Sequence, residues 1–279
     1  MNRAAIVIAV LWISACAWAQ DKPASQSAPT AQAAPTAQGK RAPAAKTQPE
    51  FDAYKAAIQL SDPAAAEKAA EDFSAKYPDS ELRVVLYKSA MQKYQANADK
   101  MLELAQKSLA IDPDDPEALV TASQVLAEKT RDTDLDRDQK IAEAKKDAER
   151  ALVTVDSDVP TAGFPPEKID QFKRFVRSEA YAILGTLASN AKNYTEAETN
   201  LRKSVEAFPE QVDPVAVLRL AIALDMQNKY PDALKHANQA VDLTKSQPDS
   251  PAAKAARSEQ DRLTKLSSGS APGQSAPQK

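Results

Sequence analysis

The chain has 279 residues, and its 36 lysines and arginines against 39 aspartates and glutamates give a net charge of −3, without the basic stripe that nucleic-acid binding requires. Five glycines are too few for the turns of a β-rich fold, while residues that favour helices dominate. With one histidine, His236, and one cysteine, Cys16, catalytic triads and most zinc sites are disfavoured. We therefore expect an all-α protein that is not an enzyme and has no cofactor.

Residues 1–19 have the features of an export signal. Asn2-Arg3 supplies a positive start, and Ala17-Trp18-Ala19 supplies a small-residue cleavage site after an apolar stretch too short to span a membrane. Ile13-Ser14-Ala15-Cys16 also resembles a bacterial lipobox, in which Cys16 would be lipidated. Both alternatives predict an exported protein, periplasmic or secreted, and the second adds an anchor in the outer membrane.

Composition divides the rest of the chain into two tails and one folded region. Residues 20–49 and 267–279 lack large apolar side chains, which predicts a disordered linker rich in Ala, Pro and Gln and a disordered tail. Residues 50–266 are expected to form a helical repeat domain. The predicted helices span 50–60, 63–77, 81–95, 98–110, 116–129, 138–154, 166–190, 194–207, 214–228, 231–245 and 251–266.

Prolines mark many of these boundaries. A proline disfavours helical geometry in the residue before it, which predicts helix ends at Tyr77-Pro78, Asp112-Pro113, Phe208-Pro209 and Gln247-Pro248. Other prolines follow an aspartate, which indicates an N-cap carboxylate with proline at the first helical position. These starts are Asp62-Pro63, Asp115-Pro116 and Asp213-Pro214.

Four positions recur near the C-terminal end of the chain with an offset of 36 residues. In each copy a small residue precedes a tyrosine, and an alanine and a further small residue follow it. Helical hairpins that repeat with such a period cannot bury their apolar faces alone and need neighbours of the same kind. The two sets are Gly185, Tyr194, Ala197 and Ser204, and Ala221, Tyr230, Ala233 and Ala240.

This pattern resembles the tetratricopeptide repeat, a pair of antiparallel helices of about 34 residues. The resemblance implies a right-handed α-α superhelix of stacked hairpins, with 251–266 as a terminal capping helix. The phrase from Ala75 to Ser80 is also similar to sequences in bacterial envelope proteins of this family. The strong copies span about 178–211 and 214–247, and the weaker ones about 47–80, 82–115 and 116–155. In the strong copies the resemblance assigns structural roles to Tyr181, Leu184, Gly185, Tyr194, Ala197, Leu201, Ser204, Pro209, Ala221, Tyr230, Ala233 and Ala240.

The resemblance also implies a partner-binding groove lined by the first helix of each hairpin. The family's paired basic and asparagine residues for a peptide carboxylate are not found. Leu218, Ile222 and Met226 form an apolar strip beside Asp225 that suits an amphipathic helix or an extended peptide, or else packs on helix 251–266. The implied groove residues are Arg83, Leu86, Lys93, Tyr94, Glu117, Gln124, Glu128, Thr186, Asn190, Leu218, Ile222, Asp225 and Met226.

The segment between the helices 116–129 and 138–154 is rich in aspartate. Its Asp132, Asp134, Asp136 and Glu143 have the spacing of carboxylate ligands in a calcium-binding loop of the EF-hand kind. Arg137 replaces the glycine that permits the sharp turn of such a loop. The alternative, which we favour, is an acidic inserted loop whose last carboxylates cap the following helix.

These features predict a non-enzymatic scaffold in the bacterial envelope that binds a protein or peptide partner. The alternative is a lipid-anchored structural component of outer-membrane or envelope assembly. A third reading, hydrolysis of a glycan by paired carboxylates, is disfavoured because the tryptophans that could form a sugar platform, Trp12 and Trp18, lie in the export signal. We expect no nucleic acid, no small-molecule substrate, and no membrane contact except through a lipid anchor.

Overall fold

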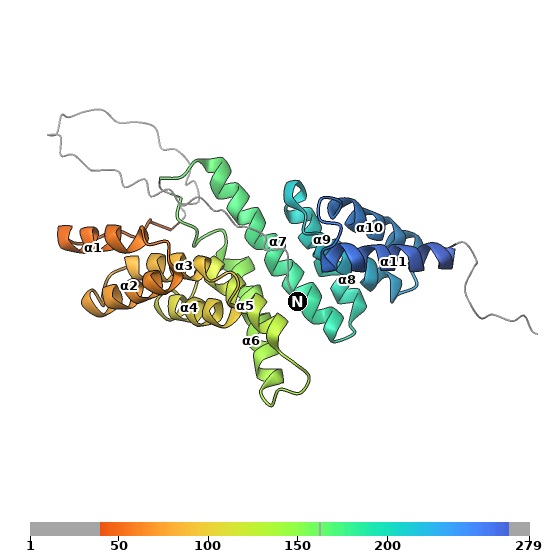
Figure 1. The fold of residues 1–279 in the computed structure, drawn as a ribbon, viewed down its shortest axis with the longest axis horizontal. Coiled ribbons are helices and arrows are strands. Elements are labelled where there is room, and N and C mark those ends of the chain that lie inside the picture. The colour runs from red at the N-terminus through yellow and green to blue at the C-terminus, as the bar shows by residue number, and fades with distance from the viewer. Residues whose placement is uncertain (1–39, 162, 268–279) are drawn as a thin grey trace, which may run out of the picture. The chain divides into compact units, whose positions relative to one another are not determined.

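The computed structural model describes residues 40–161 and 163–267 (Figure 1). The predicted export signal, Cys16 and most of the two predicted tails lie outside these residues. The described part of the chain has eleven α-helices, one short 3-10 helix and no strand, so the expected all-α helical-solenoid class is confirmed there. The helices are α1 (Gln48–Ile58), α2 (Pro63–Lys76), α3 (Leu82–Lys93), α4 (Ala98–Ile111), α5 (Pro116–Lys129), α6 (Arg137–Thr154), α7 (Pro166–Asn190), α8 (Tyr194–Ala207), η1 (Pro209–Gln211), α9 (Pro214–Asp225), α10 (Tyr230–Leu243) and α11 (Pro251–Ser267).

The predicted aspartate caps start their helices as expected. The carboxylate of Asp62 accepts the backbone N–H of Ala65 at 2.8 Å, and Asp115 accepts that of Ala118 at 2.9 Å. Asp213 accepts two N–H groups at the start of α9. Each carboxylate thereby satisfies a donor that has no partner inside the helix.

Three of the four predicted proline stops are confirmed. Tyr77, Asp112 and Phe208 follow the last residues of α2, α4 and α8, and each has an extended φ and a ψ between 67° and 89°. The stop at Gln247-Pro248 is wrong, because α10 ends earlier, at Leu243. There the hydroxyl of Thr244 bonds to the carbonyl oxygen of Ala240 at 2.9 Å and closes the last turn.

The predicted linker 20–49 is too long at its C-terminal end. Residues 40–47 pack against the helices that follow, and α1 begins at Gln48 with Thr47 as its N-cap. Ion pairs, which the composition of this stretch does not reveal, attach Lys40 and Arg41 to the fold. At the other end, Ser267 belongs to α11 and not to the predicted tail.

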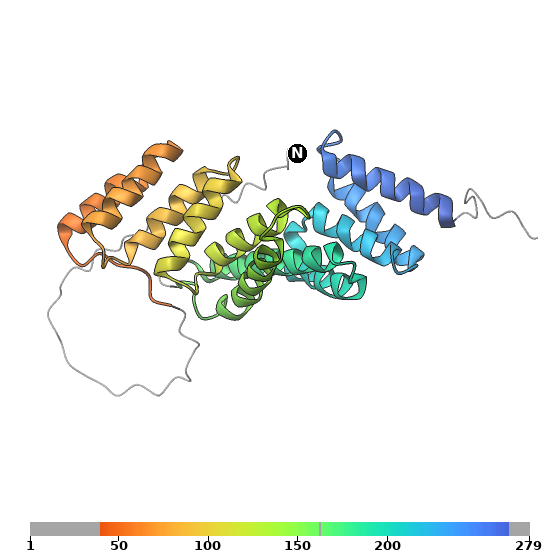
Figure 2. The same ribbon diagram turned by 90° about the horizontal axis from the view of Figure 1, so that it is seen from below.

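Contacts divide the described residues into two compact units. The N-terminal unit comprises residues 40–118 and 153–173, and the C-terminal unit comprises 119–152 and 174–267. In the N-terminal unit consecutive helices pack side by side, α1 on α2, α2 on α3 and α3 on α4 (Figure 2). In the C-terminal unit α8 packs on α9, and α10 packs on both α9 and α11.

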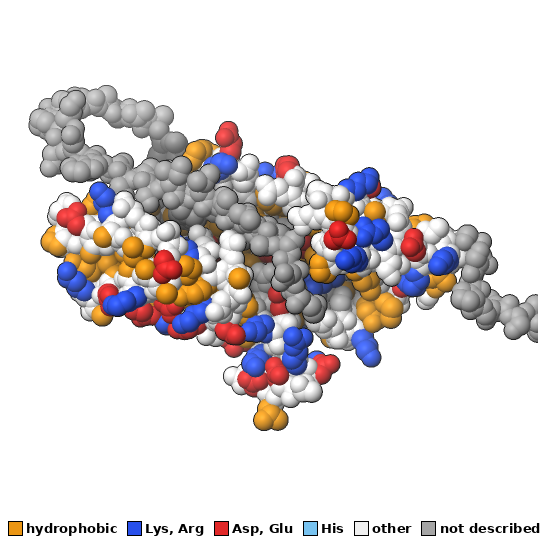
Figure 3. Space-filling model, in the orientation of Figure 1, with side chains coloured by type: hydrophobic (Ala, Val, Ile, Leu, Met, Phe, Trp, Pro, Cys, Tyr) orange, Lys and Arg blue, Asp and Glu red, His pale blue; other side chains and the backbone are white. Residues whose placement is uncertain are grey.

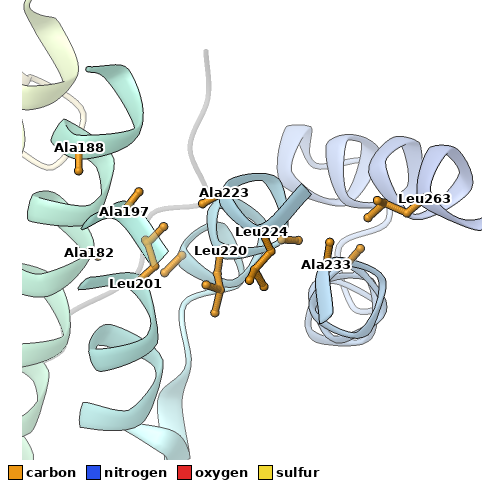
Figure 4. Packing of buried hydrophobic residues seen from close by; sticks show 12 residues of the cluster. Ala182, Ala188, Ala197, Leu201, Leu220, Ala223, Leu224, Ala233 and Leu263 are labelled. Atoms are coloured by element: carbon orange, nitrogen blue, oxygen red, sulfur yellow. The ribbon is translucent and has the colours of Figure 1, made fainter. Parts of the chain in front are cut away.

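Small side chains allow close helix packing in the C-terminal unit (Figure 4). Ala197 and Ala233 are completely buried, as the resemblance implied for these positions. Gly185 lies directly against α8, because a Cβ added to it would stand 2.5 Å from Cγ of the buried Leu201. Burying Leu201 and the equally enclosed Leu220 stabilises the unit by roughly 2 kcal/mol for each side chain.

The turns inside the two strong hairpins share one backbone geometry that the sequence pattern did not reveal. Lys192 and Asn228, which are 36 residues apart, both have a φ of 60°. The next N–H in each turn bonds back to a helix carbonyl oxygen, Asn193 to Ala188 at 2.9 Å and Lys229 to Leu224 at 3.0 Å. These left-handed turns end α9 at Asp225, three residues before its predicted end.

Candidate binding groove

A cavity of about 580 Å³ lies in the N-terminal unit. We call it the N-terminal groove. Its walls come mainly from α1, α3 and the start of α5, which are the first helices of the predicted hairpins. The end of α4 with the loop that follows it and the segments 40–43 and 158–160 complete the walls. The apolar part of the lining is formed by Tyr54, Ile58, Val84, Val85 and Ile111.

A buried lysine links two of these helices. The ammonium of Lys88 lies 2.7 Å from the carboxylate of Asp115 and 3.2 Å from that of Glu117. Burial alone would lower the pKa of Lys88, but the two carboxylates outweigh it and raise the pKa above its usual value. Gln92 completes the cluster by donating to Glu117 at 2.6 Å. The cluster attaches α3 to the start of α5 and holds one wall of the groove in place.

A second lysine of the lining is held differently. Lys93 donates to the carbonyl oxygen of Ser89 at 3.0 Å and to its hydroxyl at 2.7 Å. Burial lowers the pKa of Lys93. Within residues 40–161 and 163–267, no carboxylate lies within ion-pair distance of its ammonium.

The structure places the predicted N-terminal groove residues in different surroundings. Lys93 and Glu117 line the groove as expected. Leu86 belongs to the core, where it is 2% exposed. Arg83 donates to the carbonyl oxygen of Ser80 at 2.9 Å, and the hydroxyl of Tyr94 donates to Glu67 of α2 at 2.6 Å. These three residues, predicted to line the groove, are therefore absent from its lining.

Sequence reasoning missed the residues of α3 that do line the groove, Val84, Val85, Lys88, Ser89 and Gln92. These lie on one face because positions three and four apart are neighbours on a helix. The face was hard to recognise, since α3 carries buried side chains on most sides and gives no clear apolar stripe. The polar residues Lys88, Ser89 and Gln92, close together on a helix with many buried apolar neighbours, are the signal that could have found it.

In the C-terminal unit, the predicted strip is divided by the terminal helix. Leu218 is buried in a cluster with Ala256 of α11, and Asp225 pairs with Arg262 of α11 at 2.5 Å. The alternative in which the strip packs on the last helix therefore holds for Leu218. Ile222 and Met226 are 40% and 51% exposed and remain available.

The other predicted groove residues of this unit bond to neighbouring groups or are exposed. The Thr186 hydroxyl accepts from Arg219 at 2.8 Å and donates to the carbonyl oxygen of Ala182. Gln124 donates to Glu128 one turn further along α5, at 3.1 Å. Asn190 is exposed at the end of α7.

The aspartate-rich loop between α5 and α6 pairs with its own cations. Arg137 lies 3.1 Å from Asp132, and Lys140 lies 2.9 Å from Asp136 and 3.4 Å from Asp134. The described residues contain no group of three or more histidine, cysteine or acidic side chains placed to hold a metal ion. The calcium alternative thus has no ligand cluster here. Figure 3 shows the mixed charges of this loop and a hydrophobic group at its tip.

Two further points concern the single histidine and the possibility of a membrane-spanning helix. His236 lies on α10, where Nδ1 is 3.2 Å from the side-chain oxygen of Gln239, and burial lowers the pKa of His236. None of the helices in the described ranges combines the length and the apolar character needed to cross a bilayer.

No protein-family model matches the chain, and no curated protein matches it. One similar solved structure is "Assembly Chaperone of RpL4 (Acl4) (Residues 1-338)", which is 14% identical. The match covers 79% of this chain and 97% of that chain, with a TM-score of 0.33. A similarity of this size carries no information about function.

Proposed function

We propose that this protein is a non-enzymatic scaffold that binds a protein partner, as an extended peptide or a helix, through the N-terminal groove. The observation that carries the proposal is the cavity of about 580 Å³ on the side of the first helices. Its apolar patch of Tyr54, Val84 and Val85 suits side chains of a partner, and its charged margin can select the partner's charges.

We further propose that the hairpins are tetratricopeptide repeats. The close contact of Gly185 with Leu201, the buried Ala197 and Ala233, and the matching turns at Lys192 and Asn228 support it. Repeats of this kind use the face formed by their first helices for partners, which is the face that carries the N-terminal groove.

We also propose that the scaffold acts in the cell envelope of a bacterium, because residues 1–19 have the pattern of an export signal. The alternative function, a lipid-anchored structural component of envelope assembly, rests on the lipobox resemblance around Cys16. Mass spectrometry of the mature N-terminus separates them. A free Gln20 supports the soluble scaffold, and a diacylated Cys16 supports the anchored component.

The groove is tested by a photoreactive amino acid placed at Val85 in cells of the source organism, with the same group at Lys68 as the matched control. Val85 lines the groove, whereas Lys68 is an exposed residue of α2 with 75% of its side chain accessible. We expect one discrete protein adduct from position 85 that is missing from position 68. Equal labelling from both positions, or none from position 85, would contradict binding in the groove.

A further inference from the structure

A segment of the chain itself lies along the N-terminal groove. Residues 40–43 form part of its lining before the chain enters α1. The backbone N–H of Lys40 donates to the carbonyl oxygen of Ser157 at 2.9 Å. Further along, the ammonium of Lys46 donates to the carbonyl oxygen of Asp79 at 2.7 Å. A segment of the chain without helical structure is therefore already bound along one wall of the groove.

Charge complementarity holds the segment. Lys40 lies 2.5 Å from Asp112 and 3.4 Å from Asp158, and Arg41 lies 2.6 Å from Glu81. The other two carboxylates of the lining, Asp115 and Glu117, share the single cation of Lys88. Lys40 and Arg41 therefore offset part of the negative charge of a wall that carries more carboxylates than cations.

The contacts are weak enough to be exchanged. The Arg41 and Glu81 side chains are 68% and 46% accessible, and Lys40 is 36% accessible. Ion pairs this exposed shift an equilibrium by about fivefold or less and weaken as salt rises. The segment gains occupancy mainly because it is tethered next to the groove, which gives it a high effective concentration.

We propose that the acidic wall of the N-terminal groove, formed by Glu81, Asp112 and Asp158, recognises a basic segment, two adjacent cations followed closely by a proline, and that residues 40–46 are bound to this wall in cis. A partner segment of the same chemistry then binds by displacing them. This inference rests on the proposed scaffold function and names the class of partner that the groove takes.

The test measures binding of a fluorescein-labelled peptide with the sequence of residues 40–47 to the full chain by fluorescence anisotropy at low salt. The parent protein is compared with a variant whose own segment is released, Lys40→Glu with Arg41→Glu. We expect the released variant to bind the peptide at least tenfold more tightly than the parent. Binding should weaken with salt and disappear when the two peptide residues that correspond to Lys40 and Arg41 are replaced by glutamate.

Two further variants control this experiment. Adding Asp112→Asn and Asp158→Asn to the released variant should weaken peptide binding at least tenfold, because the wall loses its charge. Lys245→Glu with Lys254→Glu makes the same change in net charge on exposed positions of the C-terminal unit and should behave like the parent. Circular dichroism confirms that each variant is folded.

The inference is overturned if the folded released variant binds no peptide, if parent and released variant bind equally, or if the asparagine pair has no effect. The photo-crosslink at Val85 then separates the two proposals. A persistent adduct without peptide binding means that the groove takes a partner of different chemistry, so the scaffold function survives and the basic-segment inference does not. If neither the photo-crosslink nor the peptide binding is observed, both the scaffold function and the basic-segment inference are contradicted.

Discussion

Each of the two units of this protein has ion pairs between its helices, but their buried polar contacts differ. In the C-terminal unit small side chains bring helices into close contact, as where the buried hydroxyl of Ser178 donates to the carbonyl oxygen of Ser204 at 2.9 Å. In the N-terminal unit the ion pairs between helices include the partly accessible pair of Lys100 of α4 with Glu67 of α2 at 2.7 Å and the buried cluster of Lys88. Its strongest polar cluster, around Lys88, forms a wall of the groove.

The repeat pattern and the candidate binding surface lie in different units. The best matches to the repeat lie in the C-terminal unit, yet there α11 covers Leu218 and pairs with Asp225. The N-terminal unit matches the repeat poorly and carries the groove. The repeated small residues report how helices pack against each other, whereas a groove depends on which elements cover the remaining face.

The largest effect is expected from removing the buried cation of the N-terminal unit. Lys88→Met leaves the carboxylates of Asp115 and Glu117 without their partner in a buried site, which should lower the free energy of unfolding by about 3 kcal/mol. Urea denaturation followed by circular dichroism measures it. Lys93→Met is the matched control and should change stability by about 0.5 kcal/mol or less. Similar losses in both variants would show that the cluster does not hold the wall.

Gly185→Ala tests close packing in the C-terminal unit. The new methyl group would meet Leu201 Cγ at 2.5 Å, and the cost of overpacking exceeds the gain in helix propensity, so we expect a net loss of about 1–2 kcal/mol. Thermal unfolding measures the change. In a Leu201→Ala background the contacts with Cγ and Cδ2 disappear and only the 3.2 Å approach to the backbone nitrogen of residue 201 remains, so the same substitution should cost much less. A loss that persists there would point to a cause other than this contact.

Asp147 of α6 gives the C-terminal unit a distinct response to pH. Burial, followed by the charge of Glu143, raises the pKa of Asp147 to about 6 from an ordinary value of 3.8. The native state then holds this proton more tightly than the unfolded state, so stability falls as pH rises from about 4 to 6. Asp147→Asn should therefore stabilise the protein near pH 7 by on the order of 1 kcal/mol, a figure reduced for solvent screening. At about pH 3.5 the two proteins should unfold alike.

Carboxylates between helices of the N-terminal unit should make stability depend on pH in the direction opposite to that of Asp147. Hydrogen bonds from Lys100 and Tyr94 lower the pKa of Glu67 below its ordinary value of 4.5. Their contribution is present above that value and is lost as pH falls further. Glu67→Gln should therefore reduce the loss of stability in acid, measured as the midpoint of urea unfolding against pH. If the urea midpoint of the variant falls with pH as steeply as that of the parent, these contacts of Glu67 do not contribute to stability.

The smallest effect concerns the turns of the strong hairpins. Lys192 has a φ of 60°, a conformation that glycine adopts without strain, so Lys192→Gly should raise the free energy of unfolding by about 0.5 kcal/mol. Asn228→Gly is the control at the equivalent turn and should have a smaller effect, because asparagine tolerates this conformation. Differential scanning calorimetry can resolve the two. Destabilisation by glycine at 192 would show that the lysine side chain makes contacts that matter.

Helix positions were predictable because their signals act over a few residues. The carboxylate of Asp62 reaches an N–H three residues on, and Pro78 acts on the residue next to it. The length of α10 was not predictable. Thr244 ends that helix through its hydroxyl, and threonine is not a strong sequence signal for a helix end.

The groove was predicted only as a side of the fold. The sequence pattern assigned it to the first helices, but Arg83 and Leu86 were placed on the wrong face of α3. The sequence of a helix that is buried on most sides does not indicate which face points to the groove. The segment 40–46 was taken for part of a linker, since its attachment depends on Asp112 and Asp158, which are remote in sequence.

The sequence alone was thus sufficient to predict the all-α class, most helix boundaries and the small residues at helix contacts. Caps, prolines and periodic spacing act within one turn or one hairpin, so their effects do not depend on distant parts of the chain. The lining of the groove, the ion pairs of Lys40 and Arg41 with its wall and the covering of Leu218 by α11 emerge only from tertiary contacts. Such contacts join residues far apart in the chain, and whether a face is covered or open depends on which distant element reaches it.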